Sequence, residues 1–259
     1  MSEKYYFPFG QELRTVEQKD KKPKQGFVLG VYASAVHARW IDKNGKQKVN
    51  ALAVASEPEI FWTGDNAEEI ISGIQIPEEL GRLTTPRHKN LNGPSGRALD
   101  NKYLNPIGLT RENTWLCDLL PQSRLNQNQI AAIEKHYTTE IIDRFGLTPV
   151  TIPKFNKNEL NSEIRRNEIL EELEQSKAEK LILLGDLPIK WFLRYFEKNY
   201  SALSDFGESE ETYGQEHEIK INGHFYRVIA LCHPRQADRL GSSNTKWEKL
   251  HDNWINRGK

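Results

Sequence analysis

His233 and Pro234 are the feature of this sequence best suited to chemistry. They directly follow an apolar run at 226–232, and the proline turns the chain and fixes the direction of the histidine side chain. A neutral histidine at such a point can donate a hydrogen bond to an anionic leaving group. A histidine at the end of a strand is also a common structural hydrogen-bonding residue. The residue type alone therefore leaves both roles open for His233.

Asp118 is the second candidate, because it interrupts the apolar run Thr114–Leu120. A carboxylate inside a buried strand costs free energy unless it is paired or functional. We interpret it as a functional carboxylate, such as a general base, with a buried ion pair or a cap on a nearby loop as the alternative. Cys117 and Cys232 neighbour the two candidates, and strand alternation turns both thiols toward the core. No Cys/His pair has the spacing of metal ligands, so we expect no metal site.

Four short apolar runs must position these residues. Each is mostly apolar without strict alternation, which is typical of strands buried on both faces of a sheet. Helical patterns lie between the runs, and this alternation predicts a parallel sheet covered by helices. Ligands of such sheets bind beyond the carboxyl ends of the strands, where each run here ends in polar, turn-forming residues. The runs are Gly26–Tyr32, Thr114–Leu120, Lys180–Leu184 and 226–232.

The helical patterns and two Asn-Gly pairs complete the expected fold. The helices are expected at 66–71, 126–145, 158–176, 186–199 and 244–256. Asn44-Gly45 and Asn222-Gly223 predict antiparallel hairpins, since both central residues of such a turn need a positive φ. We expect an α/β fold, a three-layer α/β/α sandwich with a central, mainly parallel four-stranded sheet and antiparallel hairpin additions at its edges. Residues 1–25 are interpreted as an N-terminal arm and 26–259 as a single domain.

The composition limits the class of protein. The 259 residues include 36 basic and 36 acidic side chains, which excludes a histone-like polycation but permits a local basic patch. Two cysteines supply neither a disulfide framework nor a four-cysteine iron–sulfur cluster. No apolar run approaches the ~20 residues that span a bilayer, and the first residues lack a signal-peptide pattern. We therefore expect a cytoplasmic protein.

Four segments carry a resemblance to a known family. The stretch 93–123, GPSGRALDNKYLNPIGLTRENTWLCDLLPQS, resembles the uracil-DNA glycosylase superfamily, especially its family-four type. HPRQADRLGSSNTKWEKLHDNW is similar to the His-Pro…Lys…Trp block of that family, and LILLGDLPIKWFL to its Leu-Leu-Gly helix entry. GVYASA stands where the family has Gly-Glu-Ala-Pro-Gly.

The resemblance implies a DNA glycosylase of base-excision repair. Such enzymes flip a damaged base out of DNA and hydrolyse its N-glycosidic bond. It implies that His233 stabilises the departing base and that Asp118 holds the position that reads the base edge. It also implies that the loop 235–240 inserts into the duplex.

Several residues depart from the family pattern. Val31 and Tyr32 stand where the superfamily has Glu, Asp or Asn, and His37 is our candidate for the missing group because a hairpin start keeps it near Tyr32. GPSG lacks the Phe that stacks on the base in the family, and Tyr32 or Phe9 would supply the aromatic face in its place. The four cluster cysteines are also missing. An ionised Asp118 only accepts hydrogen bonds, whereas Asn presents a donor and an acceptor to uracil.

The expected site contains three groups of residues. The catalytic group is His233, Asp118 and His37; the base pocket is Gly30, Tyr32, Ser34 and Gly96; and the nucleic-acid contacts are Arg235, Arg239 and Lys246. Residues 233–259 carry six basic and three acidic side chains, interleaved with two tryptophans, which fits either a nucleic-acid-facing edge or an amphipathic helix.

The expected partner is single- or double-stranded DNA, bound by a monomer without cofactor, metal cluster or membrane. The alternative is a non-catalytic module that keeps the fold and binds a nucleotide or nucleic acid. An unrelated doubly wound hydrolase is disfavoured, because the sequence has neither a G-x-S-x-G elbow nor a Gly-rich phosphate loop.

Overall fold

The computed structural model describes residues 4–237 and 245–257, which form two compact units. The first unit comprises the residues up to Val16, Ala33–Pro94 and Gln122–Asn156. The second unit comprises Glu17–Tyr32, Ser95–Pro121 and the residues from Lys157 onward. Each unit is built from segments that are distant in sequence, whereas the sequence pattern predicts a single domain at 26–259.

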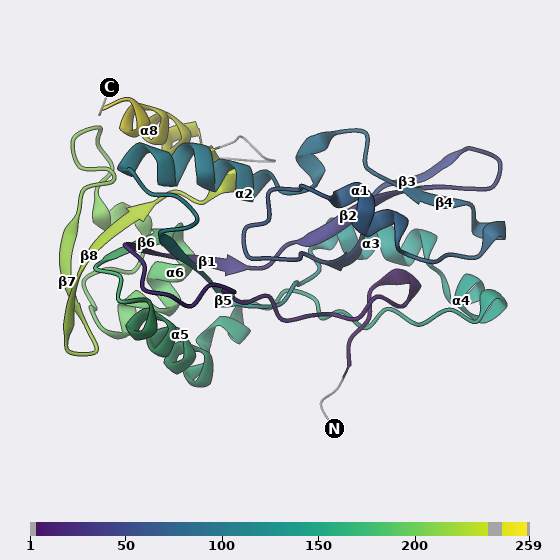
Figure 1. The fold of residues 1–259 in the computed structure, drawn as a ribbon, viewed down its shortest axis with the longest axis horizontal. Coiled ribbons are helices and arrows are strands. Elements are labelled where there is room, and N and C mark those ends of the chain that lie inside the picture. Colours follow the sequence, from purple (N-terminus) through teal and green to yellow (C-terminus); the bar gives the residue numbers. More distant parts are fainter. Residues whose placement is uncertain (1–3, 238–244, 258–259) are drawn as a thin grey trace. The chain divides into compact units, whose positions relative to one another are not determined.

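The second unit is built on a five-stranded sheet with the strand order β5-β1-β6-β8-β7 (Figure 1). The first four strands in this order run parallel, and β7 pairs antiparallel with β8. The strands are β1 Gly26–Tyr32, β5 Thr114–Leu120, β6 Lys180–Leu184, β7 His217–Ile221 and β8 His224–Leu231. The prediction that the four apolar runs form adjacent parallel strands is confirmed.

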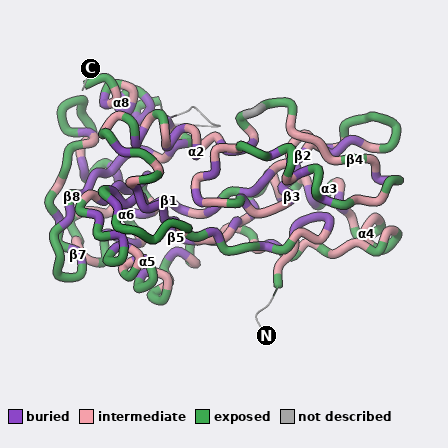
Figure 2. The backbone as a smooth tube through the Cα atoms, viewed as in Figure 1, coloured by how far each residue is buried: buried purple, intermediate pink, exposed green. Residues whose placement is uncertain are grey.

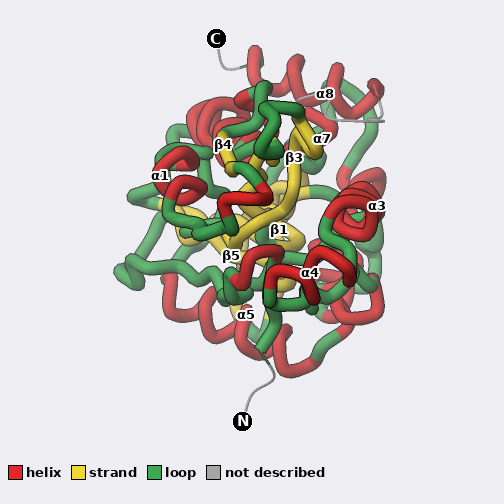
Figure 3. Tube along the Cα trace, turned by 90° about the vertical axis from the view of Figure 1, so that its right-hand side faces the viewer, coloured by secondary structure: helices red, strands yellow, loops and turns green. Residues whose placement is uncertain are grey.

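Burial on both faces explains why these strands are apolar. Every residue of β5 is buried, as is every residue of β1 except Tyr32 at its end (Figure 2). Helix α5 packs on β5, and α6 packs on β1 and β6. Helices α5 and α8 lie on opposite sides of the sheet, which gives the three-layer α/β/α arrangement (Figures 1 and 3). The helices of this sandwich are α2 Pro94–Ala98, α5 Glu163–Ser176, α6 Asp186–Trp191, α7 Pro234–Ala237 and α8 Thr245–Asn256, with a π-helical turn at Leu99–Leu104.

The hairpin at Asn222-Gly223 forms as predicted and supplies the edge strand β7. Asn222 and Gly223 have φ values of 46° and 90°, the positive range that a two-residue hairpin turn requires. The local sequence therefore determines both the turn and the register, which pairs Ile221 with His224.

The hairpin at Asn44-Gly45 also forms, but it does not extend the five-stranded sheet. In the first unit β2 Ala35–Ile41 pairs antiparallel with β3 Gln47–Ser56 and with β4 Arg82–Thr84, so the hairpin belongs to a separate three-stranded sheet. The turn is stabilised by Asp42, whose carboxylate accepts the backbone N–H groups of Asn44 and Lys46 at 2.9 Å each. Helix α3 packs on β3 (Figure 3). The helices of this unit are α1 Ala67–Ser72, α3 Gln127–His136 and α4 Thr139–Phe145.

Two further features of the first unit differ from expectation. The N-terminal segment packs in the core rather than forming an arm, since Phe7, Phe9 and Leu13 are all buried in its hydrophobic cluster. The helix expected at 126–145 is divided into α3 and α4 at Tyr137. The Tyr137 hydroxyl accepts the Phe9 N–H and donates to the Thr148 carbonyl, so tertiary hydrogen bonds hold this residue out of helical geometry.

Candidate active site at the strand ends of the second unit

His233 lies two residues beyond the end of β8, and three hydrogen bonds within its own loop hold it in place. Its N–H donates to the side-chain oxygen of Gln236 at 3.1 Å, and its carbonyl accepts the Gln236 N–H at 2.7 Å. Its ring Nδ1 accepts the backbone N–H of Arg235 at 3.1 Å. Because Nδ1 is an acceptor, the proton of the neutral imidazole lies on Nε2.

The imidazole of His233 is held in its neutral form. Burial, with a smaller contribution from the charge of Arg235, lowers its pKa to about 4. Nε2 makes no hydrogen bond to any residue that the structure describes. His233 therefore presents an N–H donor of defined direction without a positive charge.

Gly185 makes room for this histidine at the end of β6. A Cβ at position 185 would lie 3.1 Å from the Cβ of His233, and the residue has a φ of +85° that favours glycine. The Gly185 N–H donates to the Leu231 carbonyl at 2.8 Å, which ties the ends of β6 and β8 together. Next to it, the Asp186 carboxylate accepts the Leu203 N–H at 2.8 Å and anchors the following loop.

The strand order places a natural ligand position between β1 and β6. From β1 the chain crosses to β5 on one side, whereas from β6 it continues to β8 on the other, and ligands of open parallel sheets bind at such a switch point. Tyr32 ends β1 there. Burial raises the pKa of the Tyr32 hydroxyl, and the charge of Arg235 partly opposes this rise. Tyr32, Gly185 and His233 thus belong to one region of the sheet.

Asp118 is buried, with only 4% of its surface exposed, in the edge strand β5 beside Gly30 of β1. Burial raises the pKa of its carboxyl to about 7, against a lowering by the charge of Arg165 and a further rise from Glu172. At neutral pH a substantial fraction of the molecules therefore carries Asp118 as the carboxylic acid.

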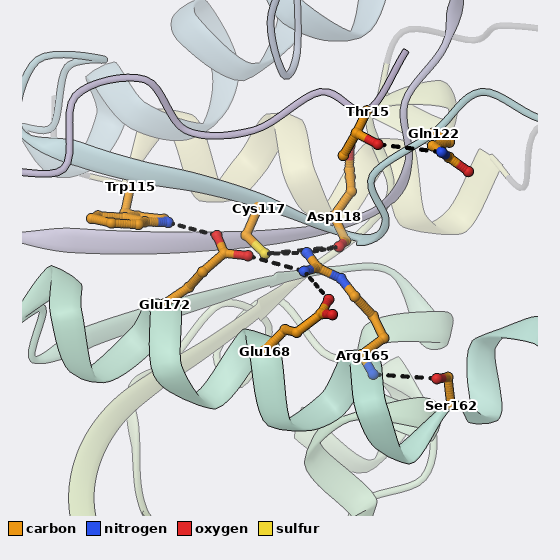
Figure 4. A network of polar contacts seen from close by, with 9 residues as sticks. All are labelled: Thr15, Trp115, Cys117, Asp118, Gln122, Ser162, Arg165, Glu168 and Glu172. Carbon is orange, nitrogen blue, oxygen red and sulfur yellow. Dashed lines mark hydrogen bonds and ion pairs between the residues drawn. The ribbon is translucent and has the colours of Figure 1, made fainter. Parts of the chain in front are cut away.

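Arg165 of α5 contacts the face of β5 that is opposite to the Asp118 carboxyl (Figure 4). It donates to the Asp118 carbonyl at 2.8 Å and to the Cys117 sulfur at 3.2 Å, and it forms ion pairs with Glu168 and Glu172. Since successive side chains of a strand alternate, Cys117 faces α5 and the Asp118 carboxyl faces away from it. The arginine thus fixes the backbone at Asp118 and leaves its carboxyl on the other face.

Asp118 and His233 both lie toward the carboxyl ends of the parallel strands, but on the first and the last of the four, so they are not neighbours. Two strands, β1 and β6, separate β5 from β8. At a spacing of about 4.8 Å per strand, roughly 14 Å separates their positions along the sheet. The two side chains therefore cannot share a proton directly, and only a ligand lying across β1 and β6 can engage both.

His37 and Ser34 belong to the first unit. The His37 backbone exchanges two hydrogen bonds with the Asn92 side chain, at 2.8 and 2.9 Å, and its ring Nε2 lies 2.9 Å from the Gln129 amide nitrogen. Burial lowers the pKa of His37 to about 4. Ser34 donates its N–H to Glu57 and accepts the Ser123 hydroxyl through its carbonyl. Both residues have structural contacts within their unit, and their expected roles in the site stay predictions.

The remaining expected residues have diverse surroundings. Gly96 is buried in α2, where its carbonyl accepts a hydrogen bond from Arg111 at 3.2 Å. Arg235 is exposed, and Lys246 pairs with Glu208 at 2.9 Å. Arg239 lies outside the described residues.

Gln236 holds His233 in place but is not among the residues predicted from the sequence. The sequence His-Pro-Arg-Gln has the spacing of a capping box, in which a Gln three residues after the cap reaches back to the cap backbone. That spacing is the signal that would have found it. Gly185 lacked a comparable signal, because only the spatial approach of His233 shows why a glycine stands there.

No protein-family model matches the sequence, and no curated protein shows significant similarity to it. Within residues 4–237 and 245–257, no helix is both long and apolar enough to cross a membrane. The same part of the chain contains no group of three or more His, Cys, Asp or Glu side chains able to hold a metal ion.

Proposed function

We propose that this protein binds a nucleobase flipped out of DNA and hydrolyses its N-glycosidic bond. The observation that carries the proposal is His233, a neutral imidazole whose Nδ1 is occupied by the Arg235 N–H and whose Nε2–H has no partner among the described residues. The resemblance of the His-Pro block and of 93–123 to the uracil-DNA glycosylase superfamily supports the same assignment.

The reaction needs a donor of this kind. The bond between the sugar C1′ and the base nitrogen breaks with its electron pair leaving on the base, a water oxygen bonds to C1′, and one proton of that water is released. Negative charge develops on the departing base, so a fixed donor stabilises the transition state more than the ground state. A pKa of about 4 keeps His233 neutral throughout the physiological range, and its Nε2–H stays available as that donor.

Asp118 would read the edge of the base. A carboxylate only accepts hydrogen bonds, but a protonated carboxyl presents one O–H donor and one acceptor, the same pair that an Asn side chain offers. With its pKa raised to about 7, the buried Asp118 is protonated in a large fraction of molecules at neutral pH. The protonated Asp118 can therefore offer uracil the same donor and acceptor as the Asn that the glycosylase family has at this position.

The test is an abasic-site assay on single- and double-stranded oligonucleotides that carry uracil, hypoxanthine, xanthine or a thymine mismatch. We expect wild-type protein to produce alkali-labile sites on at least one of these substrates, and His233→Ala to produce them far more slowly. Equal rates for the two proteins would remove His233 from the mechanism.

The second candidate is a module that binds a base or nucleotide without cleaving it. It is favoured by the end of β1, where Val31 and Tyr32 supply no carboxylate. Binding of the same oligonucleotides without cleavage by wild-type protein would establish this reading. Arg235→Glu should then reduce the slope of log affinity against log salt by about 0.9 if the side chain contacts a phosphate.

A further inference from the structure

Side chains hold both backbone groups of Cys232, the residue that precedes His233. Its N–H donates to the Tyr213 hydroxyl at 2.9 Å, and its carbonyl accepts the Tyr103 hydroxyl at 2.8 Å. The strand β8 ends one residue earlier, at Leu231. The hydroxyls of the two tyrosines thus supply the hydrogen-bond partners of this backbone, which a neighbouring strand would supply within the sheet.

His251 of α8 sets the direction of these hydrogen bonds. Its Nε2 lies 3.0 Å from the Lys102 carbonyl, which can only accept, so Nε2 carries the proton. Its Nδ1 is then an acceptor, to which the Tyr213 hydroxyl donates at 2.8 Å. The Tyr213 oxygen is left to accept the N–H of Cys232. The chain of donors and acceptors therefore has a single consistent arrangement.

The network of hydrogen bonds formed by Tyr103, Tyr213, Cys232 and His251 is fully buried, and its role goes beyond filling space in the core. Tyr103, Tyr213, Cys232 and His251 each expose 1% or less of their surface. Burial also lowers the pKa of His251 to about 4, so the ring stays neutral. Apolar side chains of similar size would fill this space without the desolvation cost of three polar groups. What only the polar network supplies is one fixed orientation of the backbone that leads into His233.

We propose that Tyr213, Tyr103 and His251 are positioning residues for His233, holding the Cys232 backbone so that the imidazole Nε2–H points in one direction. The part of this inference that concerns reaction rate rests on the proposed function. None of the three is assigned a contact with substrate.

The test compares Tyr213→Phe and Tyr103→Phe with wild-type protein, because each change deletes one hydroxyl and keeps the ring. The matched control is Tyr200→Phe. Tyr200 lies in the same unit with its hydroxyl 3.2 Å from Nδ1 of His217, so the control deletes a Tyr–His hydrogen bond that does not involve Cys232. The first readout is the ¹⁵N spectrum of the His233 ring, which reports tautomer and mobility and does not depend on any activity. The second is the single-turnover cleavage rate.

We expect both network variants to broaden or shift the His233 ring signals and to slow cleavage by about tenfold or more, as a misdirected catalytic group does. The control should change neither. If Tyr213→Phe does not fold, Tyr103→Phe carries the comparison alone. Ring signals identical to wild type in a folded network variant would overturn the positioning role. Altered ring signals in a protein that cleaves no base would support the network and refute the glycosylase proposal.

Discussion

Two histidines, one in each unit, have the same lowered pKa of about 4 and differ in the surroundings of Nε2. In the first unit, Nε2 of His37 accepts from the amide of Gln129, whose oxygen is already occupied as the cap of α3. In the second unit, Nδ1 of His233 is the acceptor and Nε2 carries the proton. Burial thus sets the charge of a histidine, whereas the hydrogen bond at one ring nitrogen determines whether the other nitrogen donates or accepts.

The largest difference is expected in catalysis. His233→Ala should lower the single-turnover rate by about 10²-fold or more, the usual cost of one well-placed donor. In His37 the Nε2 is engaged by Gln129 and the Nδ1 is fully buried without a hydrogen-bond partner among the described residues, so neither nitrogen can reach a ligand. We therefore expect His37→Ala to act through the stability of its unit. Rates are compared in samples with matched native circular dichroism. A fully folded His37→Ala protein as slow as His233→Ala would end the distinction and restore His37 as a catalytic residue.

A smaller effect on the cleavage rate is expected from the protonation of Asp118. Because the protonated form presents both a donor and an acceptor, cleavage of uracil should fall by about tenfold per pH unit as the pH rises above about 7. Asp118→Asn keeps the donor at every pH, and its rate on uracil should stay level from pH 6 to pH 9. The measurement is a pH profile of single-turnover rates on a uracil oligonucleotide. Parallel profiles for the two proteins would show that Asp118 does not read the base.

His37 and His233 should contribute equally to the loss of unfolding free energy at acidic pH. Their pKa values are about 4 in the folded protein and near 6.5 in the unfolded chain, so the unfolded chain takes up protons first as the pH falls below 6.5. Each therefore lowers the free energy of unfolding by about 1.4 kcal/mol per pH unit between about pH 6.5 and pH 4. Asp118 acts in the opposite direction, since its folded pKa is raised.

Urea unfolding at pH 7 and pH 5 measures this sensitivity. Replacing either histidine by glutamine should reduce the loss of stability between these two pH values by a similar amount. A reduction for only one of them would mean that the other histidine is charged in the folded protein at pH 5.

The smallest expected effect concerns two glycines with positive φ. Gly45 has φ +80° with no atom within 4 Å of an added Cβ, whereas a Cβ at Gly185 would press on His233 at 3.1 Å. Alanine at Gly45 should cost about 1–2 kcal/mol of unfolding free energy through backbone strain. At Gly185, whose φ of 85° and ψ of −174° lie in a region that is essentially restricted to glycine, the cost should be about 1–3 kcal/mol. Only Gly185→Ala should also slow cleavage, by a few-fold, because it displaces the histidine. Equal rates for the two variants would show that the contact with Gly185 does not position His233.

The fold could be predicted where local sequence determines the outcome. The four parallel strands are buried on both faces, so their apolar runs mark them to within a residue or two, and Asn222-Gly223 determines its turn by backbone preference alone. The N-terminal segment could not be placed, because Phe7 and Phe9 contact a core made by residues far along the chain. The break at Tyr137 likewise depends on distant hydrogen bonds.

The candidate site divides in the same way. The position of His233 at a strand end follows from the apolar run and the proline, but its tautomer depends on the Arg235 N–H, and its backbone on Gln236 and the tyrosines that hold Cys232. The pKa of Asp118 depends on burial and Glu172, which raise it, and on Arg165, which lowers it. Glu172 and Arg165 lie more than forty positions away in the sequence. Hydrogen-bond partners brought together by folding cannot be derived from spacing.

The proton position and the base contact of His233 are both measured by the ¹⁵N spectrum of its ring, recorded for the free protein and with an oligonucleotide whose damaged nucleotide carries a 2′-fluorine that blocks cleavage. We expect a neutral ring with its proton on Nε2 and an apparent pKa of about 4 in the free protein. Adding the oligonucleotide should shift the Nε2 signal as that N–H donates to the base, while Nδ1 stays an acceptor. A charged ring at pH 7, a proton on Nδ1, or an Nε2 signal unchanged by saturating oligonucleotide would show that His233 is not the donor to the departing base.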